Sequence, residues 1–355
     1  MASAPPYLLA RVDFSPSPQA AGLKFPFPVM VCDVGGTNLR IAICRTPGAA
    51  LEIVLKEPTS AHGGLESALR KATSAAGAAA RSVVVCAAGP VTGARVTLTN
   101  ADWALDGTDV ARRLGLDQGL LLNDFEAQAV ALPHLTDDMI LPVCGPAAPS
   151  DGPMLALGPG TGLGAAALLK ARGRWAVATT EAGHADFGPA DSVEEALWPH
   201  LERVEGRVTF ESVLSGPGLA RLHAALRATR GIAPADLDAA GVQAAARAGD
   251  RAAIDTIRLF WRLAARCAGD LALIFLARGG VTLSGGVLPR LVDWLDRDEF
   301  RDAFIAKAPM KALLAAVPVR LIVHGDAAMF GMARLAAAPE DYAIDYVARA
   351  WRAGA

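Results

Sequence analysis

The sequence predicts two α/β domains with a cleft between them. Apolar strand-like runs and helix-like stretches alternate along most of the 355 residues. The pattern strand, glycine turn, strand occurs twice, first in residues 29–44 and again in residues 154–170. The length fits two domains or one large one. Two halves that begin alike indicate a duplicated architecture, without the short fixed period of a solenoid.

Composition and charge exclude several classes of protein. Hydrophobic residues make up 52% of the chain and charged residues 20%, which predicts a large core rather than disorder. The net charge of −2 provides no basic excess for nucleic-acid binding. Five cysteines lie singly along the chain, which favours a reducing cytoplasm over a disulfide framework or a Cys-x-x-Cys metal site. No apolar run reaches the roughly 18 residues that span a membrane.

The first half is expected to form three antiparallel strands, then helix, strand, helix, strand and helix. Runs rich in Val, Ile and Leu predict the strands, and Ala-rich or amphipathic stretches predict the helices. The expected strands are residues 29–34, 39–44, 51–56, 82–88 and 120–122, and the helices are 64–80, 107–114 and one from 127 to 132. Residues 1–28 are rich in Pro, Ala and Ser and are expected to be an N-terminal extension rather than a signal peptide.

The second half repeats the opening and then becomes mainly helical. The expected strands are residues 154–157, 165–170, 174–180, 281–283 and 317–323, and the helices are 192–204, 210–214, 217–228, 242–248, 250–276, 289–294 and 326–337. We therefore expect a small α/β domain of residues 29–134, completed by 324–355, and a large α/β domain of residues 135–323.

A polar pair stands where one buried strand gives way to a helix. Leu120–Leu122 is followed by Asn123-Asp124, and an apolar helix is expected after it. In open α/β sheets ligands bind outside the carboxyl ends of the strands, so an acid here would face a crevice. The alternative is that Asp124 only caps the helix by accepting a backbone N–H.

Three glycine turns follow apolar strands, at Asp33–Asn38, Gly158–Gly164 and Ser284–Gly286. Glycine lets backbone N–H groups approach an anion closely, although any one of these turns could be only a tight turn. A dinucleotide-binding fold would need a helix after its glycines, and a hairpin arm is expected after Gly164 instead. A P-loop would need Gly-Lys, which the chain lacks.

Glycine turns at hairpins, one in each half, resemble the phosphate-binding elements of sugar kinases in the actin/Hsp70/hexokinase superfamily. The chain is most similar to the bacterial glucokinase family. The segments that carry this similarity are Leu122–Phe125, Glu181–Phe187, Glu211–Leu219 and Thr99–Trp103. The resemblance extends from Val29 to the C-terminus. It implies a two-domain actin-like ATPase (ribonuclease H-like) fold with an active-site cleft between the domains.

The resemblance also implies an activity, the ATP-dependent phosphorylation of D-glucose to glucose 6-phosphate in glycolysis. Asp124 would be the general base, since phosphoryl transfer needs positioning, charge neutralisation and a base near the attacking hydroxyl. The residues implied to hold glucose are Asn123, Asp124, Glu181, His184 and Glu211. Those implied to meet ATP are Asp33, Gly35, Gly36, Thr37, Asn38, Gly160, Thr161, Gly162, Gly285 and Gly286. Asp33 would contact Mg²⁺ through water.

The loop around His184 departs from relatives in two respects. A related sugar-kinase family that includes repressors carries a cysteine-rich zinc motif after this element, whereas here no cysteine follows His184 until Cys267, so zinc is not expected. Thr180 and Ala182 replace two glycines that are frequent in the glucokinase family, which affects the loop's freedom and fine sugar specificity. An alternative function for Glu181, His184 and Asp186 is a metal site.

Other functions stay open from the sequence. A kinase for another hexose or an amino sugar is one, and a non-catalytic sugar-binding regulator is another, although the first 28 residues are short and Pro-rich for a helix-turn-helix. ADP or polyphosphate could replace ATP as donor. The expected partners are glucose and ATP, with no nucleic acid and no membrane, and the family suggests a cytoplasmic homodimer.

Overall fold

The computed structural model describes residues 23–89, 91–97 and 103–352 of the chain. Contacts between Cα atoms divide these residues into two compact units. Unit 1 contains the described residues up to Ala127, together with Lys170–Val177 and the residues from Met329 onward. Unit 2 contains Gln128–Leu169 and Ala178–Ala328. The motif Thr99–Trp103 lies outside the described residues except for Trp103, and so does the extension up to residue 22.

Unit 1 is built on a mixed six-stranded sheet. Its order is β15-β8-β4-β1-β2-β3, in which β8, β4 and β1 are mutually parallel and the other neighbours are antiparallel. The strands are β1 (Val29–Val34), β2 (Asn38–Cys44), β3 (Glu52–Pro58), β4 (Ser82–Ala87), β8 (Gln118–Asn123) and β15 (Ala350–Arg352). The central strands β1, β4 and β8 are almost entirely buried, as expected for apolar runs covered on both faces.

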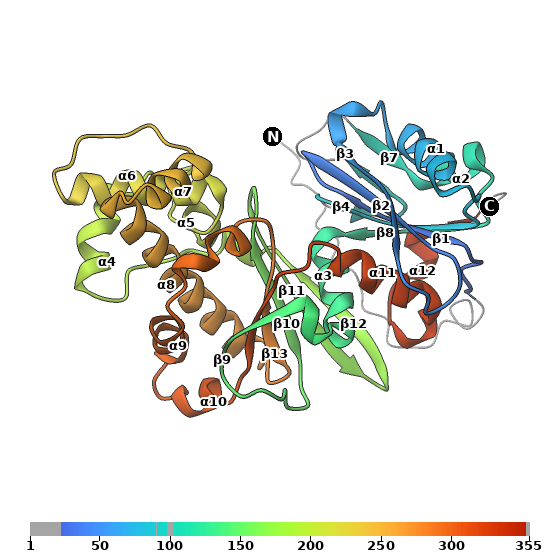
Figure 1. Cartoon of the computed structure of the whole chain (residues 1–355). Coiled ribbons are helices and arrows are strands. Elements are labelled where there is room, and N and C mark those ends of the chain that lie inside the picture. The colour runs from blue at the N-terminus through green and yellow to red at the C-terminus, as the bar shows by residue number, and fades with distance from the viewer. Residues whose placement is uncertain (1–22, 90, 98–102, 353–355) are drawn as a thin grey trace, which may run out of the picture. The chain divides into compact units, whose positions relative to one another are not determined.

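Helices cover both faces of this sheet (Figure 1). α1 (Leu65–Ala76) and α2 (Gly107–Leu114) pack on one face, where their leucines, valines and alanines join a core with the side chains of β1, β2 and β4. The C-terminal part of α11 (Ala327–Ala337) lies on the other face, followed by α12 (Tyr346–Arg349). A small sheet of β5 (Val91–Thr92), β6 (Arg95–Thr97) and β7 (Ala104–Asp106) contacts β8 and α2.

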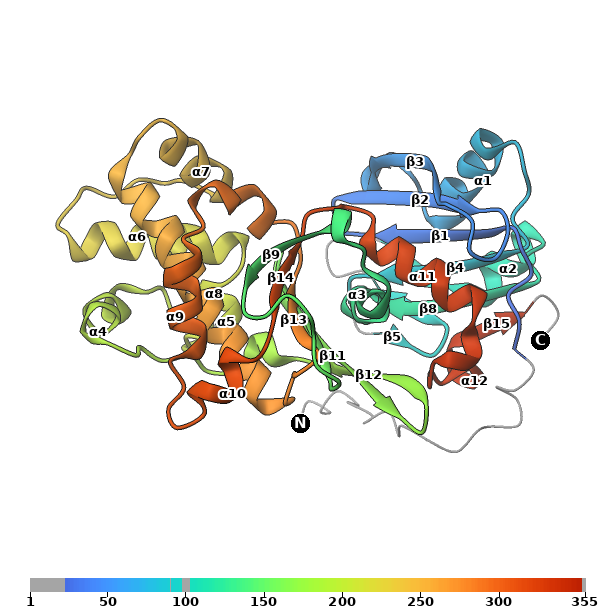
Figure 2. The same cartoon turned by 60° about the horizontal axis from the view of Figure 1, so that its bottom comes forward.

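Unit 2 has a second six-stranded sheet with a helical layer. The sheet order is β12-β11-β10-β13-β14-β9. Its strands are β9 (Ile140–Cys144), β10 (Met154–Pro159), β11 (Leu163–Ala171), β12 (Arg174–Thr180), β13 (Gly280–Leu283) and β14 (Val319–Ile322). The end of β11 and the first part of β12 lie in the segment Lys170–Val177, which belongs to unit 1. The helices are α4 (Ser192–Leu197), α5 (Phe210–Val213), α6 (Gly216–Thr229), α7 (Ala239–Arg247), α8 (Arg251–Ile274), α9 (Arg297–Ile305) and α10 (Lys311–Ala315). The long α8 packs against α6, α7 and α9, and Figure 2 shows it in the middle of this layer.

The alternation of strands and helices predicted from the sequence is confirmed, and the structure differs from the prediction in several details. The helix expected over residues 192–204 ends at Leu197, because Pro199 has no N–H group to continue the α-helical hydrogen bonds, and a 3₁₀ turn, Trp198–His200, follows. The segment Leu288–Trp294 is a 3₁₀ helix rather than an α-helix. The helix α3 (Asp124–Ala131) begins three residues earlier than expected, directly at Asp124.

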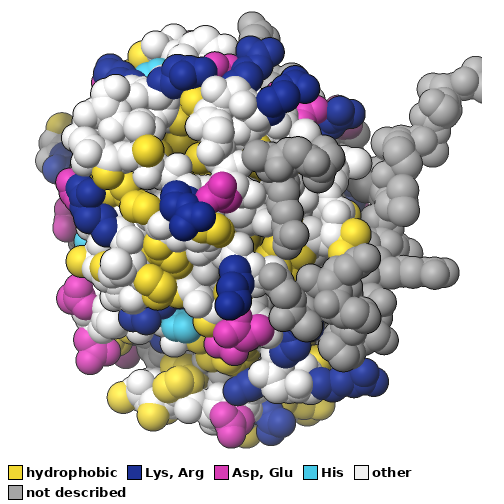
Figure 3. Space-filling model, turned by 90° about the vertical axis from the view of Figure 1, so that its right-hand side faces the viewer, with side chains coloured by type: hydrophobic (Ala, Val, Ile, Leu, Met, Phe, Trp, Pro, Cys, Tyr) yellow, Lys and Arg dark blue, Asp and Glu magenta, His cyan; other side chains and the backbone are white. Residues whose placement is uncertain are grey.

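The charged side chains of the surface are mixed in sign. On the face drawn in Figure 3, basic and acidic groups are interspersed among neutral and hydrophobic ones and form no continuous basic surface. Within the described part of the chain, no helix is both long enough and apolar enough to cross a membrane.

Candidate active site

Two acidic residues of unit 1 lie at the carboxyl ends of neighbouring parallel strands. Asp33 is the second-to-last residue of β1, and Asp124 follows directly after β8. Only β4 separates these strands, since Cys86 is paired with Asp33 on one side and with Leu122 on the other. The parallel topology therefore brings together two of the predicted site residues that are 91 positions apart in the sequence.

Asp33 is held by groups from both adjacent strands. Its Oδ2 lies 2.9 Å from Nη2 of Arg40, its cross-strand neighbour on β2. The Cys86 thiol donates to its Oδ1 at 3.6 Å. Complete burial, reinforced by the nearby carboxylates of Asp33 and Asp124, holds the pKa of Cys86 well above its usual value, so the thiol stays protonated and can donate.

The turn Gly35–Asn38 is braced from behind by Thr59. The Gly35 N–H donates to Asn38 O at 2.9 Å and closes the turn. The Thr59 hydroxyl donates to Gly35 O at 2.7 Å, and its N–H donates to Thr37 O at 3.0 Å. Thr59 is completely buried, whereas Thr37 and Asn38 are exposed. The turn is thus fixed by its carbonyls, and sequence reasoning missed Thr59 because no local pattern marks it.

The residue that caps α3 is Asn123, not Asp124. Asn123 Oδ1 accepts the N–H groups of Phe125 at 2.9 Å and Glu126 at 3.3 Å. Glu126 Oε2 accepts the Asn123 N–H in return at 3.2 Å, which completes a capping box. Asn123 Nδ2 donates to Gly89 O at 3.2 Å. The alternative that Asp124 serves only as the cap is therefore wrong.

The environment of Asp124 suits a base that works near neutral pH. Its pKa is raised from 3.8 to about 6: burial and, to a smaller extent, the negative charge of Asp33 raise it, and the Phe125 N–H, donated at 3.0 Å, lowers it in part. A carboxylate with this pKa is ionised at pH 7 yet basic enough to accept a proton efficiently.

In unit 2 the turn between β10 and β11 is tied to Glu211. The Leu163 N–H donates to Glu211 Oε2 at 2.9 Å. A Cβ on Gly162 would lie only 2.4 Å from the same oxygen, so a larger residue there would displace the carboxylate. Gly160 donates its N–H to Gly162 O at 2.7 Å, and its own oxygen accepts the Gly216 N–H at 2.8 Å. The structure therefore joins the predicted phosphate turn Gly160–Gly162 to a predicted sugar ligand.

The third glycine turn contacts the same region of unit 2. Ser284 donates its N–H to Leu157 O at 2.8 Å. Gly285 has φ +82°, and a Cβ on it would lie 2.5 Å from Pro159 O, so both conformation and space require glycine. A Cβ on Gly158 would lie 2.5 Å from the Ser284 backbone. The turns that begin at Gly158 and Ser284 thus pack directly on each other, while Gly286 has open space around it.

Glu181 and His184 present exposed side chains on an anchored loop. Their side chains are 75% and 60% exposed, and Glu181 Oε2 is 3.9 Å from His184 Nε2. Gly183 lies so close to the β11 backbone that a Cβ would be 2.4 Å from Leu163 O. Arg207 Nη2 donates to His184 O at 3.0 Å, a support that sequence reasoning missed. The loop backbone is thus fixed while its polar side chains remain accessible.

The alternative of a metal site in this loop finds no support among the described residues. Asp186 forms an ion pair with Arg207, with Oδ1 2.7 Å from Nη2. No group of three His, Cys, Asp or Glu residues in the described ranges could hold a metal ion. The acid therefore serves to anchor Arg207.

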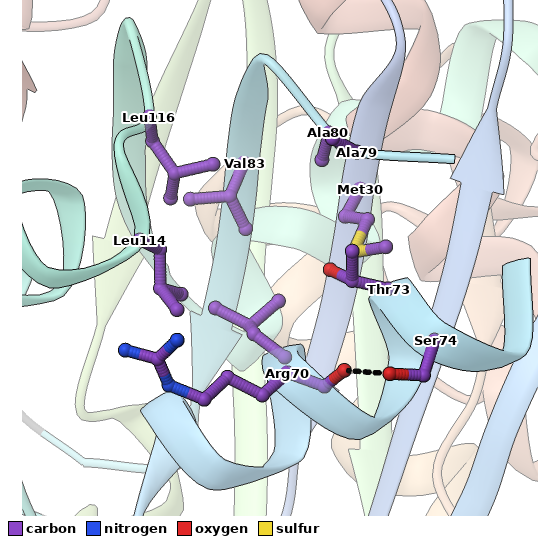
Figure 4. A pocket seen from close by; sticks show the side chains of 10 residues that line it. Met30, Arg70, Thr73, Ser74, Ala79, Ala80, Val83, Leu114 and Leu116 are labelled. Carbon is purple, nitrogen blue, oxygen red and sulfur yellow. Dashed lines mark hydrogen bonds between the residues drawn. The ribbon is translucent and has the colours of Figure 1, made fainter. Parts of the chain in front are cut away.

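A cavity of about 390 Å³ in unit 1 lies away from these residues. It is bordered by α1, by the starts of β1 and β4, and by the end of α2 (Figure 4). Its apolar wall includes Met30, Val83 and Leu116, and Arg70 lies at its edge. None of the predicted site residues lines it.

Comparisons with known proteins agree with the fold. The family model described as "Glucokinase" matches residues 30–339. A glucokinase of Sinorhizobium medicae (strain WSM419) is 38% identical over 337 residues, which cover 94% of this chain and 99% of that protein. The crystal structure of a glucokinase from an Antarctic psychrotroph is 30% identical, covers 87% of this chain and 98% of that chain, and superposes with a TM-score of 0.78. A ROK family glucokinase from Streptomyces griseus, solved in complex with glucose and AMPPNP, shares the fold at 22% identity with a TM-score of 0.58, over 86% of this chain and 98% of that one. The chain, an α/β protein of the actin-like ATPase fold, belongs to the glucokinase family.

Proposed function

We propose that this protein transfers the terminal phosphoryl group of ATP to the 6-hydroxyl of D-glucose. The observation that carries the proposal is the half-buried Asp124 carboxylate at the end of β8, with its pKa raised to about 6. A hydroxyl attacks a phosphoryl group only as its proton departs, and a preorganised carboxylate of this basicity can receive that proton. Relatives that cover nearly the whole chain are named glucokinases.

The proposed step moves one proton and one phosphoryl group. Asp124 accepts the proton of the 6-hydroxyl as the oxygen bonds to the γ-phosphorus, and the bond between that phosphorus and the β,γ-bridging oxygen breaks. ADP leaves with the electron pair of the broken bond, and Asp124 later releases its proton to solvent. Asp124 thus supplies a base, and the remaining catalysis comes from positioning and charge neutralisation.

Backbone groups of the glycine turns are the proposed contacts of ATP. Gly35, Gly36, Thr37 and Asn38 would meet its phosphates, and so would Gly160, Thr161 and Gly162. Gly285 and Gly286 would lie against the adenine. The open space at Gly160 and Gly286 supports this assignment, since neither has a non-neighbouring atom within 4 Å of where a Cβ would be.

Magnesium fits Asp33 as a ligand that acts through water. One carboxylate oxygen already pairs with Arg40 and the other accepts from Cys86, so the group suits contact with the hydration shell better than direct coordination. When bound with ATP, the ion supplies positive charge that neutralises the phosphates.

In addition to Asp124, four polar side chains are the proposed glucose ligands. They are Asn123, Glu181, His184 and Glu211. The exposed Glu181 and His184 and the second N–H of the Asn123 amide can donate to or accept from sugar hydroxyls. Such contacts discriminate strongly, because a sugar that lacks the matching hydroxyl leaves polar groups unpaired.

An assay coupled to product formation tests the activity. Purified protein would be supplied with glucose, fructose, mannose or glucosamine, each with ATP, ADP or polyphosphate as donor. We expect the highest kcat/KM for glucose with ATP. A higher value for another sugar would establish a different hexose kinase. Glucose binding in calorimetry without turnover of any sugar would establish a non-catalytic regulator.

The pH dependence of turnover provides a separate test of the base. Because Asp124 must be ionised to accept a proton, kcat should be level near pH 7–8. It should fall about tenfold per pH unit below the pKa of about 6. Initial rates at saturating glucose and ATP would be measured from pH 5 to 9, with samples returned to pH 7.5 to check reversibility. A kcat that stays constant down to pH 5 would rule out a base of this pKa.

We further propose that the protein acts in the cytoplasm, in glycolysis, as a homodimer. The resemblance to bacterial glucokinases and the scattered free cysteines support the first two points. Light scattering of the purified chain would measure its assembly, and a mass of one chain at micromolar concentration would contradict the dimer.

A further inference from the structure

The C-terminal segment of the chain is built into the edge of the sheet beside the strand that carries Asp124. β15 pairs antiparallel with β8, so that Trp351 lies opposite Gly119. The Trp351 ring is buried against Gly107 and Gly119, where added Cβ atoms would lie 2.4 Å and 2.1 Å from ring atoms. Gln118 Nε2 donates to Trp351 O at 3.0 Å. These contacts fix the position of the preceding residues relative to β8.

Arg349 is the last residue of α12, directly before β15, and from there its side chain contacts the buried carboxylate of Glu126. Its Nη1 lies 2.5 Å from both Oε1 and Oε2 of Glu126. The Glu126 side chain is 5% exposed and that of Arg349 is 18% exposed. A carboxylate so buried requires a charged partner, and removing that partner leaves a charge with neither water nor a cation.

Glu126 in turn orders the backbone at the proposed base. Its Oε2 accepts the N–H of Asn123, and Asn123 Oδ1 accepts the N–H of Glu126, so the two residues close a ring around Asp124. Asn123 Nδ2 also donates a hydrogen bond to Gly89 O, two residues beyond the end of β4. The orientation of the Asp124 backbone, directly after β8, therefore depends on the position of the Glu126 carboxylate.

We propose that Arg349 and Glu126 are positioning residues for the base, so that the C-terminal segment helps to set the catalytic geometry. This inference rests on the proposed role of Asp124 in phosphoryl transfer. Neither side chain needs to touch glucose or ATP. Arg349 fixes the Glu126 carboxylate, Glu126 fixes the Asn123 N–H, and the capped turn aims Asp124.

The test compares Arg349→Met, Glu126→Gln and the double variant. Arg349→Met should lower kcat by about 10- to 100-fold, since displacing a catalytic group by about 1 Å can cost that much. The KM for ATP should change little. Glu126→Gln keeps an oxygen for the Asn123 N–H and needs no counter-charge, so its kcat should stay close to wild type. The double variant should therefore recover about fivefold or more over Arg349→Met. Arg349→Lys should restore part of the activity.

A readout without turnover keeps the inference independent of the base assignment. In Arg349→Met, hydrogen exchange of the peptide Leu120–Gln128 should become faster, because the Glu126 carboxylate that accepts the Asn123 N–H is no longer held in place by Arg349. The matched control is Arg81→Met, which breaks the exposed ion pair with Asp117 at the other end of β8. Exchange of Leu120–Gln128 and kcat should both be unchanged in the control.

The outcomes distinguish the positioning role of Arg349 and Glu126 from the assignment of Asp124 as the base. Wild-type kcat and exchange in a folded Arg349→Met variant would overturn the positioning role, and so would a double variant no more active than Arg349→Met. If Arg349→Met does not fold, Arg349→Lys takes its place, and wild-type kcat and wild-type exchange in Arg349→Lys would overturn the positioning role. If Asp124→Asn retains activity, the base assignment fails, while the exchange data still decide whether Arg349 orders the turn.

Discussion

Replacement of Asp124 by asparagine is expected to lower kcat by a factor of about 10² to 10⁴, the range that a general base contributes. Asparagine has nearly the same shape and can still accept the Phe125 N–H through Oδ1, as the aspartate does. It cannot take the proton of a sugar hydroxyl. The loss should therefore appear in kcat, while calorimetry should still detect glucose binding. Asp124→Ala should lose turnover similarly.

The same replacement is expected to stabilise the folded protein at neutral pH. Burial raises the pKa of Asp124 from 3.8 to about 6, so the folded state binds a proton more tightly than the unfolded state does. This contribution to stability is fully present below pH 4 and is lost as the pH rises through 6. At pH 7 the ionised carboxylate costs up to about 3 kcal/mol of unfolding free energy.

Urea titrations at pH 7 would measure this effect. Asp124→Asn should unfold at a higher urea concentration than wild type, and the difference should shrink toward pH 4. A variant that is inactive and also less stable at pH 7 would contradict the proposed environment of the carboxylate. Near-normal kcat in the variant would remove Asp124 from the role of base.

The two strand–turn–strand openings could be predicted from sequence because their determinants are local. Buried strands appear as unbroken apolar runs, and Gly35-Gly36 and Gly160–Gly164 mark the turns. The short strand β9 and the helix α9 were missed, since Pro142 interrupts the former and many charged residues occupy the latter. Their formation depends on packing, which a single sequence does not display.

Among the polar residues that support the site, some could likewise be predicted from local sequence and others could not. The spacing of Asn123 and Glu126 is a capping-box signal that was present in the sequence and would have identified Asn123 as the cap. Arg349 lies 223 positions from Glu126, and Thr59 lies 24 from Gly35, so only the folded chain brings these partners together. The resemblance to a family supplied the roles of the site residues, because the stretch around Asp124 alone favoured a helix cap over a catalytic acid at this strand end.

Replacement of Glu211 should have the second large effect on activity, because this residue combines a proposed sugar contact with support of the phosphate turn. Glu211→Ala is expected to lower kcat/KM for glucose about 100-fold, which corresponds to losing charge-assisted hydrogen bonds worth about 3 kcal/mol. It also leaves the Leu163 N–H without its acceptor, so the KM for ATP should rise as well.

Glu211→Gln separates these two roles. Glutamine keeps an oxygen for the Leu163 N–H but loses the negative charge offered to glucose. We therefore expect kcat/KM for glucose to fall while the KM for ATP stays near wild type. Glu195→Ala, at an exposed position of α4 in the same unit, is the control and should leave both constants unchanged. If Glu211→Ala and Glu211→Gln raise the KM for ATP equally, the hydrogen bond to Leu163 does not order the turn. If neither affects glucose, Glu211 is only a structural support, and sugar selectivity must then come from Asn123, Glu181 and His184.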